Sequence, residues 1–165
     1  LVIEMAADAS DGTAAPPTSE AGLAWRGFVE RFVAEAQFDD PGQPAPRSGG
    51  LGWIKLPLPG GHYINLFRDR TAQQVGAQVR FAGADGEAAF AELLADRDAI
   101  DAEFAQGGLP APQWPEGEVP MLLLTTRSPL PWDEPREAEQ RQWLARAGNQ
   151  LVNSLRPRLQ RMGSA

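Results

Sequence analysis

Arginines gather in the middle of the chain, in a stretch whose alternating pattern predicts β-strands. Arg68, Arg70 and Arg80 lie in or beside these predicted strands, near the only lysine, Lys55. A guanidinium binds phosphate and carboxylate groups through a rigid fork of N–H donors. These side chains, Arg68 and Arg80 above all, could therefore line a positively charged groove on the open face of a sheet and contact nucleic acid. The alternative is an ordinary solvated sheet surface.

Carboxylates dominate the stretch from residue 85 to residue 106. Its polar face carries a single base, Arg97, and six acids, which are Glu87, Glu92, Asp96, Asp98, Asp101 and Glu103. One interpretation is an enzyme site made of carboxylates, in which Asp96 and Asp101 act beside Arg97 and the guanidinium meets an anion in a cleft. The alternative is a solvated helix face on which Arg97 pairs with Asp101, four residues further on.

Aromatic residues near the end of the chain form a third candidate site. Trp132, Trp143 and Asn149 lie in or beside a predicted final helix, close to Arg141 and Arg146. Exposed aromatic side chains next to arginines are typical of surfaces that recognise a partner protein. The alternative is that Trp143 anchors the helix in the core.

Several chemistries are excluded by what the sequence lacks. It has no cysteine, which rules out disulfides, thiolate zinc sites, iron–sulfur clusters and cysteine nucleophiles. One histidine cannot supply the usual zinc ligands, and no Gly-Lys-Ser/Thr sequence forms a phosphate-binding loop. His62 follows two glycines, so we expect an exposed turn residue. The sequence thus assigns no catalytic residue, metal site or cofactor, and it does not favour an enzyme.

The composition is typical of a single soluble domain. Its 165 residues are 42% hydrophobic and 22% charged, and the net charge of −7 counts against a general affinity for nucleic acid. No apolar run approaches the roughly 18 residues of a membrane span, and no signal-peptide pattern is seen. These features, with the lack of cysteine, favour the cytoplasm. We expect a strand remnant and linker over residues 1–19, followed by one α+β domain over residues 20–165.

Hydrophobic periodicity places the elements of the first half. A first helix, capped by Ser19, is expected over residues 20 to 38. Three strands should follow at residues 53–58, 62–68 and 73–81. The short connections between them predict an antiparallel meander with one covered and one more open face.

The second half is built around a long helix. We expect this helix over residues 85 to 106, with Asp85 as its N-cap and Gly107-Gly108 as its end. A second pair of strands is predicted at residues 112–114 and 119–126. The continuous apolar run in the second of these strands suggests a central strand that is buried on both faces.

The last helix should begin after Asp133, and Pro157 should kink or break it near residues 153 to 156. The order of helix, three-stranded meander, long helix, two strands and C-terminal helix predicts an α+β two-layer sandwich.

Three stretches together resemble a bacterial domain of unknown function that is commonly joined to the C-terminal end of a PD-(D/E)XK nuclease-like domain. They are WRGFVERFV, FAELLADRDAIDAEF with the following QW, and WLARAGNQLVNSLRPRLQ. The resemblance covers residues 20 to 162. It implies an accessory domain in a DNA-handling or defence protein and carries no catalytic residues. Nuclease cores of that type need a lysine two residues after a metal-binding acid, and here Trp53 precedes Lys55 at that spacing.

The first functional hypothesis is therefore a non-catalytic recognition domain of a larger protein. Its partner would be an upstream domain, another protein or, through the arginines, a nucleic acid. A homodimer through the last helix is a further hypothesis, because Ala147 and Gly148 would let two helices approach closely.

Overall fold

The computed structural model describes residues 19–50, 52–115 and 117–163. Its elements are, in chain order, α2 (Glu20–Glu35), β1 (Arg47–Ser48), β2 (Trp53–Leu58), β3 (His62–Asp69), β4 (Gln74–Arg80), α3 (Gly83–Ala95), α4 (Arg97–Gln106), β5 (Met121–Arg127) and α5 (Glu134–Gly163). The α+β class and the predicted order of helix, meander, helical region and C-terminal helix are confirmed.

The five strands form one antiparallel sheet in the order β1-β2-β3-β4-β5, so each strand pairs with its neighbour in the sequence. The predicted meander corresponds to β2, β3 and β4. The expected second strand pair is reduced to one antiparallel bridge, between Gln113 and Leu123, and β5 makes its full pairing with β4 instead. The apolar run of β5 therefore lies at the edge of the sheet. Leu122 and Leu124 enter the main core, while Leu123 packs on the opposite face.

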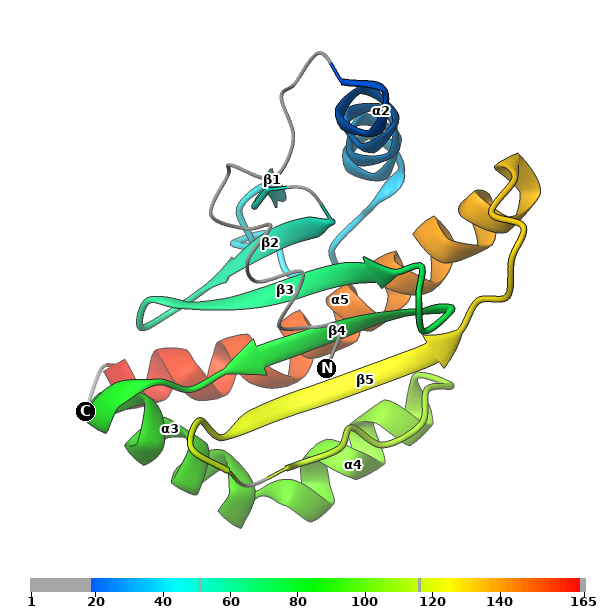
Figure 1. Cartoon of the computed structure of the whole chain (residues 1–165). Coiled ribbons are helices and arrows are strands. Elements are labelled where there is room, and N and C mark those ends of the chain that lie inside the picture. Colours follow the sequence, from blue (N-terminus) through cyan, green and yellow to red (C-terminus); the bar gives the residue numbers. More distant parts are fainter. Residues whose placement is uncertain (1–18, 51, 116, 164–165) are drawn as a thin grey trace.

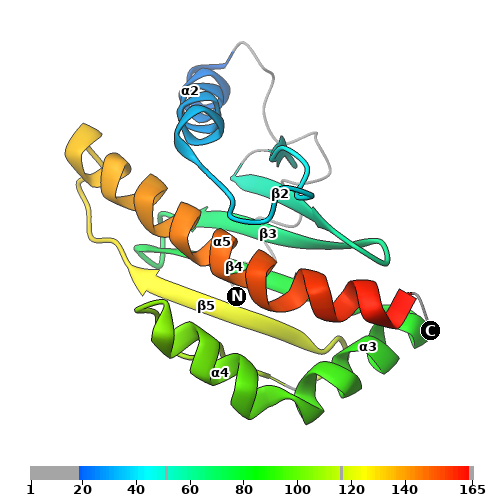
Figure 2. The same ribbon diagram turned by 180° about the vertical axis from the view of Figure 1, so that it is seen from behind.

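The helices cover one face of this sheet. Helix α5 runs across the back of the strands in Figure 1 and lies in front of them in the reverse view of Figure 2. Helix α2 packs against α5, while α3 and α4 contact it further along. The large core lies between these helices and the sheet, and a small second cluster of Trp53, Phe67 and Leu123 lies on the other face.

Helix α5 is continuous through Pro157, so the predicted break is absent. Asp133 begins the helix as predicted, since its Oδ1 accepts a hydrogen bond from the backbone N–H of Arg136 at 3.1 Å. Ala147 and Gly148 face the sheet: Ala147 is fully buried, and a Cβ added at Gly148 would lie 2.9 Å from Leu56 Cδ1. The small residues thus allow the helix to approach its own sheet, which corrects the expectation that they form a dimer surface.

The predicted long helix is divided in two at Asp96. α3 begins at Gly83, with Ala82 at its N-cap, so Asp85 lies in the first turn and is not the cap. The backbone N–H of Asp96 bonds back to the carbonyl of Leu93 at 2.9 Å, and α4 starts at the next residue. No described helix is long and apolar enough to cross a membrane.

Candidate functional site

Arg68, the first of the predicted binding arginines, points into the helix layer and away from the open face. It pairs with Val75 across β3 and β4, on the side of the sheet that carries the main core. Its Nη1 donates to Glu137 Oε2 at 2.7 Å, and its guanidinium lies 4.0 Å from the centroid of the Phe28 ring. Burial lowers the pKa of Arg68, and the hydrogen bond with Glu137 opposes this shift.

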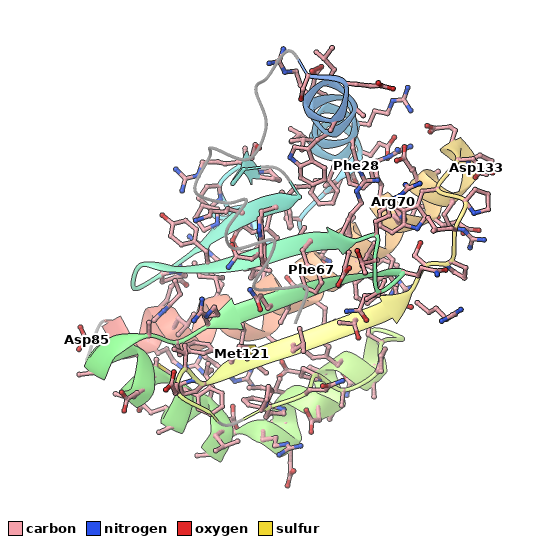
Figure 3. The ribbon with its side chains drawn as sticks, in the orientation of Figure 1. Phe28, Phe67, Arg70, Asp85, Met121 and Asp133 are labelled. Atoms are coloured by element: carbon pink, nitrogen blue, oxygen red, sulfur yellow. The ribbon has the colours of Figure 1, made fainter. Side chains whose placement is uncertain are left out.

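The surroundings of Arg68 explain how a buried guanidinium is tolerated. The rings of Trp25 and Trp132 lie 5.3 Å and 5.1 Å from it, so it has aromatic faces as well as a carboxylate. A buried charge is stabilised by such partners and is costly without them. Figure 3 shows Phe28 and Arg70 in this region, where α2 meets the start of α5. Arg68 therefore joins helix to sheet, and the expectation that it lines one groove with Arg80 is wrong.

Arg80 does lie on the side of the sheet that none of the described helices covers, which we call the helix-free face. It carries the residues that alternate with the core residues along the strands: Arg47, Trp53, Lys55, Pro57, Tyr63, Asn65, Phe67, Asp69, Gln74, Gly76, Gln78, Arg80, Met121, Leu123, Thr125 and Arg127. Figure 3 labels Phe67 and Met121 on β3 and β5 of this sheet.

Three cations of the helix-free face, Arg47, Lys55 and Arg80, form a row that runs across the strands. Arg47 pairs with Lys55 in the β1–β2 register, and Lys55 pairs with Asn65 on β3. Arg80 lies opposite Tyr63, since Ile64 pairs with Val79, so the row runs diagonally across the strands. The Tyr63 hydroxyl accepts a hydrogen bond from Arg47 Nη2 at 3.1 Å, and Lys55 Nζ lies 5.1 Å from the ring centroid. We call Arg47, Lys55 and Arg80 the basic row.

Charge is distributed unequally between the two sides of the sheet. The strands contain five bases, of which only Arg68 faces the helices, and a single acid, Asp69, which is buried on the helix-free face. On the helix side, Arg68, Arg141 and Arg158 all pair with carboxylates at 2.5 to 3.0 Å. Within the described ranges, no ion pair is formed by Arg47, Lys55, Arg80 or Arg127.

A buried amide lies beside the basic row. Gln78 pairs with Asn65 across β3 and β4, and it is only 2% exposed. Its Oε1 has no hydrogen-bond partner. An unpaired buried acceptor costs roughly 1–3 kcal/mol, and a donor supplied by a ligand would remove that cost. The face thus combines cations with a buried acceptor that no described residue pairs.

An apolar patch closes one end of the helix-free face. Phe67 lies over Gly76, where an added Cβ would be 2.4 Å from Phe67 Cζ, and its ring centroid is 5.7 Å from that of Trp53. Both aromatic side chains are buried, so they stabilise the sheet and present little ring surface.

Arg97 forms the predicted ion pair with Asp101, at 3.5 Å between Nε and Oδ2. Asp101 also accepts a hydrogen bond from Trp114 Nε1 at 3.3 Å. Asp96 and Glu103 are both held by Arg158, and hydrogen bonding with that arginine lowers the pKa of Glu103. These carboxylates thus support the α3–α4 break, and the described residues contain no group of three or more side chains suited to a metal ion.

His62 is half-buried, which corrects the expectation of an exposed turn residue. Its ring lies 5.2 Å from that of Phe81, and burial lowers the pKa of His62 while the charge of Asp85 opposes the shift. A shallow hollow of about 310 Å³ lies beside it, lined by Asp85, Glu92, Leu159 and Met162 among others.

The residues of the third candidate site, Trp132, Trp143 and Asn149, make contacts within the domain. Trp132 donates from Nε1 to the Ser128 carbonyl at 2.8 Å, and Trp143 packs against the core, which is the anchoring alternative. Asn149 exchanges two hydrogen bonds with Asp39, at 2.9 and 3.0 Å, and lowers the pKa of that carboxyl. These residues fasten α5 to its neighbours and form no common surface.

Sequence reasoning missed Arg47 and the role of Gln78. Arg47 belongs to a two-residue strand inside a Pro/Gly-rich stretch, too short for an alternating pattern. The position of Gln78 could have been predicted, because in the sequence it lies between the apolar Ala77 and Val79 and two residues before Arg80. Comparison of the chain with protein-family models, curated proteins and solved structures finds no match.

Proposed function

We propose that this chain is a non-catalytic recognition domain of a larger bacterial protein, and that it binds an anionic partner on the helix-free face. The association with a nuclease-like or defence-type protein, and a cytoplasmic location, rest on the sequence resemblance and composition. The binding surface rests on the geometry of the sheet.

One observation carries the proposal: the unpaired cations of the sheet collect on the face that no described helix covers. Arg47, Lys55, Arg80 and Arg127 lie there without an ion-pair partner among the described residues, in a chain whose net charge is −7. Arginines that serve the fold, such as Arg68 and Arg158, have their carboxylates beside them. Cations that the fold does not neutralise are available to a partner.

The difference in charge between the helix-free face and the acidic helices favours binding of an anion at this face alone. Acidic side chains on α3 and α4 repel an anion, while the basic row attracts it. A field of this shape orients an approaching partner and raises its association rate. The non-catalytic part of the proposal is supported by the carboxylates of α4, since Asp101 and Glu103 are engaged with Trp114, Arg97 and Arg158.

Charge reversal tests the proposal. The Lys55→Glu/Arg80→Glu variant should bind a labelled polyanion, either poly-L-glutamate or a single-stranded oligonucleotide, about 100-fold more weakly, because it loses two charge-assisted contacts of roughly 1.5 kcal/mol each. Fluorescence anisotropy at low salt measures this change.

The matched control is Arg26→Glu/Arg161→Glu. Both of these arginines are exposed on helices, and this variant alters the net charge by the same amount. Its affinity should stay within about threefold of the parent, since distant charges are screened. Equal losses in the two variants would show that net charge alone governs binding and would contradict a site on the helix-free face.

A further inference from the structure

Resting on the proposed function, we infer that the partner of the helix-free face is a single-stranded nucleic acid, whose phosphates follow the basic row and whose bases meet Asn65 and Gln78. This identifies the chemical class of the ligand and separates it from acidic proteins and duplexes.

The extent of the basic row indicates an elongated anion. Arg47, Lys55 and Arg80 stand on β1, β2 and β4. Neighbouring strands are about 4.8 Å apart, so the row spans roughly 14 Å at the backbone. One phosphate or one carboxylate cannot reach all three cations. A chain of regularly spaced charges that crosses the strands can do so.

The amides next to the row favour bases over an acidic peptide. Gln78 Oε1 is buried, unpaired and requires an N–H donor. A peptide lying flat on a sheet directs its backbone N–H groups sideways, so they do not point down at Gln78. A base that is splayed from a single strand presents the N–H groups of its Watson–Crick edge, beside the phosphates that bind the cations.

A duplex fits the face less well. Its Watson–Crick donors are already paired, and reading a groove requires a helix or ribbon that enters it. None of the described helices lies on this face. The half-buried Tyr63 ring holds two cations of the row in place, with Lys55 Nζ at 5.1 Å and the Arg47 guanidinium at 5.4 Å from its centroid.

The test measures binding of the full chain to four fluorescent probes by anisotropy: (dT)20, (U)20, a 20-base-pair duplex and poly-L-glutamate. We expect either single strand to bind at least about tenfold more tightly than the duplex or poly-L-glutamate. Three phosphate contacts predict a slope of about −2 for log affinity against log salt concentration. The ratio between (dT)20 and (U)20 distinguishes DNA from RNA.

Two variants test separately whether the basic row binds the phosphates and whether Gln78 binds a base. Lys55→Ala/Arg80→Ala leaves one phosphate contact, so the slope should fall to about −0.7. Gln78→Met keeps the side-chain length and removes the acceptor; it should weaken single-strand binding about fivefold with the slope unchanged. Circular dichroism establishes that both variants are folded.

The alternatives give different results. If poly-L-glutamate binds as tightly as the oligonucleotides and Lys55→Ala/Arg80→Ala weakens its binding, the nucleic-acid inference is overturned. An anion-binding recognition face then remains. Single-strand binding that both variants leave unchanged would overturn the site. Binding of none of the four probes would overturn both this inference and the proposed anionic partner.

Discussion

Gly76→Ala is expected to destabilise the chain by about 3 kcal/mol, because the added methyl group has no room beside β4. The new Cβ would lie 2.4 Å from Phe67 Cζ and 2.6 Å from the backbone oxygen of Leu124. Phe67 cannot swing away freely, since it is 1% exposed and packs against Trp53. Urea denaturation followed by circular dichroism measures the loss of unfolding free energy.

Gly27→Ala is the matched control for this substitution. Gly27 lies in α2, and nothing is within 4 Å of an added Cβ. Alanine stabilises an exposed helix position by about 0.5–1 kcal/mol relative to glycine. The same chemical change should therefore have opposite signs at the two sites. A Gly76→Ala variant as stable as the parent would show that β3 and β4 do not pack as described.

Arg158→Met is expected to lower the free energy of unfolding by about 2 kcal/mol at pH 7. The guanidinium joins α5 to the α3–α4 junction through Asp96 at 2.5 Å and to α4 through both oxygens of Glu103 at 2.9 Å. Arg158 is 13% exposed, but its partners are 46% and 37% exposed. Water can therefore rehydrate the carboxylates, and the loss is smaller than for a fully buried pair.

The loss should depend on pH in a defined direction. The pKa of Glu103 is lowered in the folded chain, chiefly by hydrogen bonding with Arg158. Its contribution to stability is complete above the ordinary pKa of glutamate and disappears as the pH falls through the lowered value. The difference between parent and Arg158→Met should thus be largest near pH 7 and shrink in acid. Arg161→Met, at an exposed position three residues on, should change stability by less than about 0.5 kcal/mol.

Local patterns predicted the elements whose ends are determined by nearby residues. Ser19 caps α2 by accepting a hydrogen bond from the Gly22 N–H at 2.9 Å, and Gly108, at φ 77°, follows the end of α4. Asp133 begins α5. The helix break at Asp96 could not be predicted, because no glycine or proline marks it. Its carboxylate is held by Arg158, which is 62 residues away in the sequence.

The candidate site was only partly predictable for a related reason. Strict alternation groups Arg68 with Ile64 and Leu66, on the core side, and this pattern was available in the sequence. Phe67 obscured it, because a large apolar residue on the opposite face makes both faces of β3 look buried. The basic row depends on the register between β1 and β2, which a two-residue strand cannot reveal before the structure is known.

The most direct test of a recognition site on the helix-free face is an amide chemical-shift map of the ¹⁵N-labelled chain, titrated with (dT)20 and, separately, with poly-L-glutamate. The expected result is that the shifts for at least one probe concentrate on Lys55, Asn65, Gln78 and Arg80, including the side-chain amides of Asn65 and Gln78. Shifts confined to α3, α4 or the hollow beside His62, with the strands unaffected, would contradict it.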